Sequence, residues 1–138
     1  MDLFQRTPAA MSEEAFMARF AATCFQRLPD APAHGPVIFA TPIGPITGPE
    51  ALFTPLLQRL SAGAATGADL MSLPAFADDF GALVQSIQLL MMQGFAHPMN
   101  RAAQPGEDRA QALSRWFARN DIALEVIGTC ATASAAAR

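Results

Sequence analysis

Apolar residues recur at helical spacing in several parts of the chain, the first of them near the N-terminus. Phe16, Phe20 and Cys24 share one side of a segment that follows Ser12, a residue suited to cap a helix. Two glutamates come directly after that serine, where the helix dipole favours negative charge. The pattern predicts a helix over about 13–27, with Cys24 as a small core residue on its apolar side.

The next part of the chain changes from a strand-like pattern to a helical one. A run of strand formers at 37–39, followed by the proline-containing segment 39–48, predicts a small hairpin or two short extended pieces at a sheet edge. Within 49–63, an apolar stripe then predicts a helix ended by a glycine. The helix could begin at Pro49 or at Pro55, and the pattern does not decide between them. The stripe consists of Phe53, Leu56, Leu57 and Leu60.

The strongest helical pattern lies at 80–94, after a short helix expected around 68–73. Seven residues of this segment fall on one face and are expected to be core, namely Phe80, Leu83, Val84, Ile87, Leu90, Met91 and Gly94. Gly94 also fits a helix C-cap that leads into an extended segment. Leu89 and Met92 lie off the stripe, so they are either covered by another element or exposed for a partner.

A last helix is expected near 107–119, burying Leu113, Phe117 and Trp116. The order of elements predicts a mainly α fold with a small β-hairpin: a winged-helix-like core with flanking N- and C-terminal helices. The corresponding organisation is an N-terminal connector and helix (1–30), a winged-helix-like accessory domain (31–120) and an Ala-rich C-terminal segment (121–138). The last segment could be helix, strand or tail.

Composition narrows the classes of function. The chain has 138 residues, of which 51% are hydrophobic and 15% charged, and a net charge of -3. This length suits one domain. There is no run of about 20 apolar residues and no N-terminal signal pattern, so we expect a cytoplasmic protein without a membrane partner. The negative charge, and the lack of Arg or Lys between residues 80 and 94, disfavour a nucleic-acid partner.

No recognisable chemical motif occurs along the chain. The glycine-containing stretches lack the spacing that nucleotide binding requires, no GxSxG or HExxH is present, and two cysteines make neither a disulfide framework nor a metal site. Asp78 and Asp79 precede a helix, which suits capping better than acid-base catalysis. We therefore expect no enzyme activity, no cofactor and no metal.

Two histidines remain, His34 in a Gly/Pro loop and His97 before a proline. His97 could contact a ligand or partner, although a solvent-facing structural role is favoured. The expected interface consists of Leu89, Met92, Gln93 and His97.

Several stretches together resemble one family: the C-terminal regulatory region of bacterial SAM-dependent methyltransferases of the protein-lysine methyltransferase type. The resemblance rests on DLFQR with MSEEAF at 2–16, on TPIGPITGPEALFTPLLQRLSAG at 41–63, on LVQSIQLLMMQGFAHPM at 83–99 and on RAQALSRWFARN at 109–120. Two departures stand out, because Phe53 replaces the family's tyrosine before the PLL element and the similarity ends after Asn120.

The resemblance implies a winged-helix-like accessory domain that regulates, positions substrate for or dimerises a methyltransferase. It provides no catalytic residue. The expected partner is a SAM-dependent methyltransferase catalytic domain in cis or in trans, with a homodimer as a further possibility, and the chain is expected to be a piece of a longer enzyme or a stand-alone relative. The alternatives are a winged-helix transcription regulator and a small-molecule-sensing domain.

Overall fold

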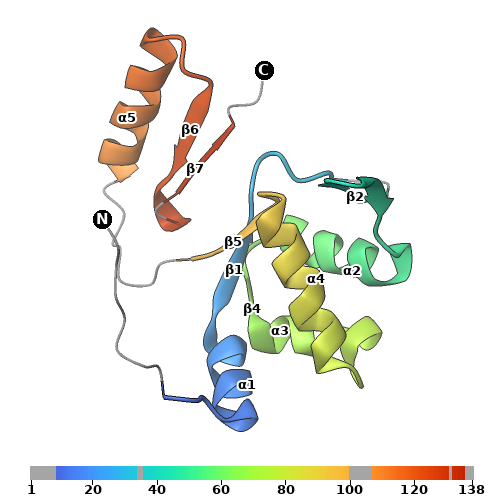
Figure 1. Ribbon diagram of the computed structural model, residues 1–138. Helices are drawn as coiled ribbons and strands as arrows, with labels where there is room; N and C mark the ends of the chain where they lie inside the picture. Colours follow the sequence, from blue (N-terminus) through green and yellow to red (C-terminus); the bar gives the residue numbers. More distant parts are fainter. Residues whose placement is uncertain (1–8, 34–35, 100–106, 131, 136–138) are drawn as a thin grey trace.

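The computed structural model describes residues 9–33, 36–99, 107–130 and 132–135, and short strands alternate with helices throughout this part (Figure 1). The helices are α1 (Glu13–Ala22), α2 (Glu50–Ser61), α3 (Gly67–Met71), α4 (Phe80–Met92) and α5 (Glu107–Arg119), with 3-10 turns η1 (Pro74–Phe76) and η2 (Gly128–Cys130). The strands are β1 (Cys24–Arg27), β2 (Ile38–Thr41), β3 (Gly44–Thr47), β4 (Ala65–Thr66), β5 (Ala96–Pro98), β6 (Leu124–Ile127) and β7 (Thr132–Ala135).

The expected fold class is wrong, because the strands in the described part of the chain form three small separate sheets rather than the single hairpin of a mainly α winged helix. One sheet has the order β4-β1-β5, and the other two are the hairpins β2-β3 and β6-β7. In the three-stranded sheet β1 is central and antiparallel to both neighbours, with Phe25 opposite Ala65 on one side and opposite Pro98 on the other. The fold is therefore a mixture of helices and small sheets.

The difference begins at the end of the first helix, which was expected to reach residue 27. Helix α1 stops at Ala22, and Thr23 adopts an extended conformation while its hydroxyl donates a hydrogen bond to the carbonyl of Arg19 (2.8 Å). The next four residues are β1. Residues 24–27 have helical apolar spacing but form a strand. Pairing with the distant strands β4 and β5 is favoured, because it supplies hydrogen-bond partners to the backbone N–H and C=O groups on both sides of β1.

Helices α2 and α4 both contribute buried residues to the main core, as predicted. All four residues of the α2 stripe are buried, and the helix begins at Glu50 after Pro49 and continues through Pro55. In α4, Leu83, Ile87 and Leu90 are buried against the same cluster. The α2 stripe and part of the α4 stripe therefore face inward, as expected for amphipathic helices that pack on one core.

Both ends of α4 are capped by the residues that the sequence predicts. The carboxylate of Asp79 accepts a hydrogen bond from the amide of Ala82 (2.8 Å), so this aspartate is an N-cap. At the other end Gly94 has a φ of 72°, the left-handed conformation that favours glycine after a helix. These capping predictions are confirmed.

The buried face of α4 is rotated relative to the predicted stripe. Met91, expected in the core, is exposed, whereas Ser86, expected outside it, is buried. The Ser86 hydroxyl is satisfied inside the helix, since it donates to the carbonyl of Ala82 (2.7 Å). A serine can thus occupy the core without an unpaired polar atom.

Residues 107–135, which we call the C-terminal unit, form a small assembly of α5 with the β6-β7 hairpin (Figure 1). Strand β6 is attached to the helix by the amide of Val126, which donates to the hydroxyl of Ser114 (2.9 Å). The predicted burial of Leu113 and Trp116 is wrong: Trp116 is 52% exposed and Leu113 is also exposed, while Phe117 is half-buried. The hairpin covers only one side of α5, which leaves these two side chains toward solvent.

Candidate functional site: an exposed apolar surface at the end of helix α4

Clusters of side chains suited to a metal ion are not found in the described ranges. Across residues 9–33, 36–99, 107–130 and 132–135, no group of three or more His, Cys, Asp or Glu side chains is placed to hold a metal ion. Within the same ranges, none of the helices has both the length and the apolar character needed to cross a bilayer. His34 lies outside the described residues. The candidate sites that follow are exposed surfaces of the kind that bind a partner.

Two of the four expected interface residues are clearly exposed. Leu89 is 40% and Met92 is 81% exposed, and both lie in the last turns of α4. The sequence left two alternatives for Leu89 and Met92, coverage by another element or exposure. Their exposure excludes coverage by another described element. A long, flexible methionine side chain in water is free to adapt to a binding partner.

Gln93 has a structural role at the same end of the helix. Its side-chain amide donates to the carbonyl of Ala40 (3.1 Å), while its amide oxygen accepts a hydrogen bond from the Ala40 N–H (3.4 Å). One side chain thus pairs both backbone groups at the outer edge of β2, much as a neighbouring strand would. Gln93 fixes the β2-β3 hairpin beside the end of α4.

His97 lies beyond the Gly94 turn, in β5, and the register places it opposite Gln26 of β1. Its Nδ1 atom is 2.8 Å from the carbonyl oxygen of Pro98, so the ring is held by its own strand. The structure thus brings Leu89, Met92 and Gln93 together at one helix end, and places His97 on the sheet.

The hairpin adds exposed apolar residues that the sequence interpretation did not include. Ile38, Ile43 and Ile46 are all exposed, and Ile43 at the turn reaches 90%. Strand alternation could have indicated Ile38, since its neighbour Phe39 is a natural core residue and successive side chains point to opposite faces. Phe39 indeed packs on Phe53 of α2, with ring centroids 5.0 Å apart.

We call these exposed residues the α4–hairpin surface. It comprises Leu89, Met91 and Met92 from α4 together with Ile38, Ile43 and Ile46 from the hairpin, where Ile38 and Ile46 lie on opposite faces because Ile46 is paired with Phe39. No Asp, Glu, Lys or Arg occurs in residues 36–49 or 80–99, which contain both elements. The surface is therefore apolar and free of formal charge on its own segments, which suits an apolar protein surface better than a phosphate backbone.

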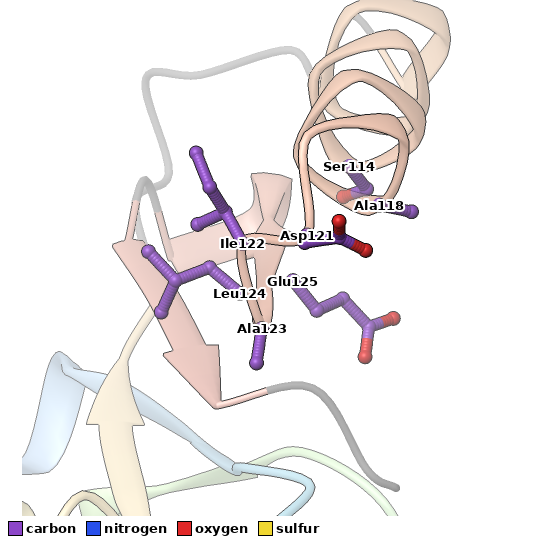
Figure 2. Close-up of a pocket in the computed structure, with 7 residues that line it drawn as sticks. All are labelled: Ser114, Ala118, Asp121, Ile122, Ala123, Leu124 and Glu125. Carbon is purple, nitrogen blue, oxygen red and sulfur yellow. The ribbon is translucent and has the colours of Figure 1, made fainter.

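A second feature is a groove in the C-terminal unit, between α5 and the segment that leads into β6 (Figure 2). Its volume is about 470 Å³, and a neighbouring hollow of about 380 Å³ continues it along β6. Figure 2 shows the carboxylates of Asp121 and Glu125 directed to the same side, below the end of the helix. They make the groove unfavourable for anionic ligands.

The groove is shallow, because almost all the side chains that line it are exposed to solvent. Small-molecule sites usually enclose most of their ligand's surface and direct a few polar groups toward it. The groove lacks that enclosure, so the α4–hairpin surface is the stronger candidate for function.

The chain matches no family model, no curated protein and no solved structure in the comparisons made with it.

Proposed function

We propose that this chain is a non-catalytic regulatory or accessory domain that docks onto a SAM-dependent methyltransferase catalytic domain through the α4–hairpin surface. The observation that carries the proposal is the group of exposed, uncharged apolar side chains on two elements that Gln93 holds together. Exposed apolar patches mark interaction sites on soluble domains, and here the exposed side chains come from two neighbouring elements. The class of partner comes from the resemblance in sequence, and the contact could be made in cis or in trans.

The energetics favour Met92 and Ile43 as the principal contacts. Both side chains are almost fully exposed in the free domain, so association can remove nearly their whole apolar area from water. Complete burial of such a side chain contributes about 1.5–3 kcal/mol. No charge on these segments has to be desolvated at the same time.

The test is the affinity of the purified chain for a SAM-dependent methyltransferase domain encoded in the same reading frame or in a neighbouring gene. We expect Met92→Ser and Ile43→Ser each to raise Kd about tenfold, which corresponds to about 1.4 kcal/mol. Leu113→Ser is the matched control, because Leu113 is also an exposed apolar residue but lies on α5. An equal loss of affinity in the control, or unchanged affinity in both test variants, would contradict the proposal.

The proposal also places methyl transfer in the partner, and the domain itself in the cytoplasm without a nucleic-acid ligand. It predicts that the isolated chain neither transfers methyl groups nor binds SAM, and that its binding to duplex DNA is weak and salt-sensitive at a net charge of -3. Saturable SAM binding at micromolar concentration in calorimetry, or a sequence-specific DNA complex at physiological salt, would show that the domain has another function.

A further inference from the structure

The outer face of the three-stranded sheet is covered by part of the C-terminal unit. Phe25 and Ala96 point into the core, so strand alternation places Cys24, Gln26 and His97 on the opposite face. Turn η2 lies against this face. The hydroxyl of Thr129 donates to the side-chain oxygen of Gln26 at 2.6 Å.

Cys130 of η2 is buried at this contact. Its Sγ is 3.7 Å from the side-chain oxygen of Gln26 and 4.0 Å from the carbonyl oxygen of His97. The other cysteine of the chain, Cys24, precedes Gln26 by two residues, which is about 7 Å along a strand and on the same face. Burial raises the pKa of the Cys130 thiol, and the neighbouring Cys24 contributes to that rise.

We propose that Cys24 and Cys130 are a reversible disulfide site that fixes the C-terminal unit onto the sheet, with a small-molecule disulfide such as oxidised glutathione as the oxidant. The two residues are both free cysteines in the structure, one half-buried and one buried. Cys130 of η2 touches Gln26, and Cys24 stands two residues away on the same face of β1, so the two cysteines are neighbours on this face; a disulfide spans Cα atoms up to about 7 Å apart. A short slide of η2 along β1, from Gln26 toward Cys24, completes the approach.

The exchange proceeds in two steps. The more exposed Cys24 thiolate attacks one sulfur of the oxidised glutathione, forms a mixed disulfide and releases one glutathione thiolate. The Cys130 thiolate then attacks the Cys24 sulfur and releases the second glutathione. The two protein thiols lose two electrons, glutathione disulfide gains them, and the two protons pass to the released glutathione molecules. Reversibility suits a reducing compartment, where such disulfides are transient.

The experiment treats the reduced, folded full-length chain with oxidised glutathione and follows it by mass spectrometry. We expect loss of both free thiols, no retained glutathione, and a cross-link between the tryptic peptides 20–27 and 120–138. Cys24→Ser and Cys130→Ser should each lose this cross-link. If Cys130→Ser does not fold, Cys24→Ser alone still provides the comparison with a single thiol.

Gln26→Cys in the Cys24→Ser background is the geometric control, because the Gln26 side chain already touches the Cys130 sulfur. We expect this variant to restore the cross-link. The proposal is overturned if the control cross-links while the natural pair stops at glutathionylated Cys24, or if the natural pair leaves both thiols free under the same conditions.

Discussion

At the scale of single residues, the contrast between the two sides of α4 gives the sharpest test of the fold. Ile87 is 2% exposed in the main core, whereas Met92 lies almost entirely in solvent. We predict that Ile87→Ala lowers the free energy of unfolding by about 2–5 kcal/mol, from lost burial and the cavity left behind. Met92→Ser should change it by less than about 0.5 kcal/mol. Denaturant titration measures both, and equal losses would mean that Met92 is packed inside the domain.

Asp69 provides a second test, through pH. Its pKa is lowered chiefly by the hydrogen bond from the Thr66 backbone amide (3.0 Å), then by the Thr66 side chain, with a smaller contribution from Arg59. A carboxyl whose pKa is lower in the folded protein stabilises the fold in its ionised form. That contribution is complete above the ordinary pKa of about 4 and is lost as the pH falls through the lowered pKa.

We therefore predict that acidification below about pH 4 removes the Asp69 contribution to stability, and that Asp69→Asn removes this part of the pH dependence. The carboxylate and Thr66 form a capping box at the start of α3, where the Asp69 amide also donates to the threonine hydroxyl (3.2 Å). Melting temperatures of both proteins across pH 3–7 measure the effect. Parallel curves for the variant and the natural chain would exclude Asp69 as a source of the pH dependence.

At the scale of elements, the junction between α1 and α3 depends on a glycine. The Gly67 amide donates to the carbonyl of Thr23 (2.8 Å), and a Cβ on Gly67 would lie 2.0 Å from the backbone oxygen of Phe20. A methyl group cannot be accommodated there unless the two helices move apart. We predict that Gly67→Ala destabilises the domain by about 3 kcal/mol, the upper end of the usual cost of overpacking.

Gly81 is the matched control, since it lies within α4 and a Cβ there would be 3.4 Å from its nearest neighbour, the Asp79 carboxylate. Gly81→Ala should stabilise the domain by about 0.5–1 kcal/mol, because alanine loses less backbone freedom in a helix. Thermal or denaturant unfolding of the pair distinguishes a steric effect from a general effect of glycine replacement. Two variants of equal stability would contradict the close packing of α1 on α3.

At the scale of the whole molecule, the described residues divide into parts of unequal stability. The members of the main hydrophobic cluster that the structure describes lie between Phe20 and Ala96. The C-terminal unit leaves Leu113 and Trp116 in solvent and makes hydrogen bonds to the rest of the described chain through η2. Local stability follows buried apolar contact.

We predict that backbone amides of α4 exchange with solvent deuterium at least about a hundredfold more slowly than those of α5, since each 1.4 kcal/mol of local stability changes an opening equilibrium tenfold. Hydrogen exchange followed by mass spectrometry measures this on the intact chain. Similar protection in the two helices would mean that the C-terminal unit and the main core unfold together.

What the sequence alone determined is the local content of the helices and turns. Residues 107–119 form the expected helix, the α2 stripe is buried, the hairpin at 38–47 is present, and both ends of α4 have the expected caps. These features depend on neighbours within a few positions: apolar spacing, a capping carboxylate, or a glycine with positive φ. Short-range physics of this kind is visible in the order of the residues.

What only the tertiary structure decided is which segments pair and which faces are covered. Residues 24–27 are a strand because Ala65 and Ala96, far away in the sequence, supply its neighbours. Ser86 is buried, and Met91 and Trp116 are exposed, because the surrounding elements cover one side of each helix and leave another open. The Gln93–Ala40 link that positions the candidate surface is also long-range. Pairing and coverage depend on distant segments, so the local pattern could not specify them.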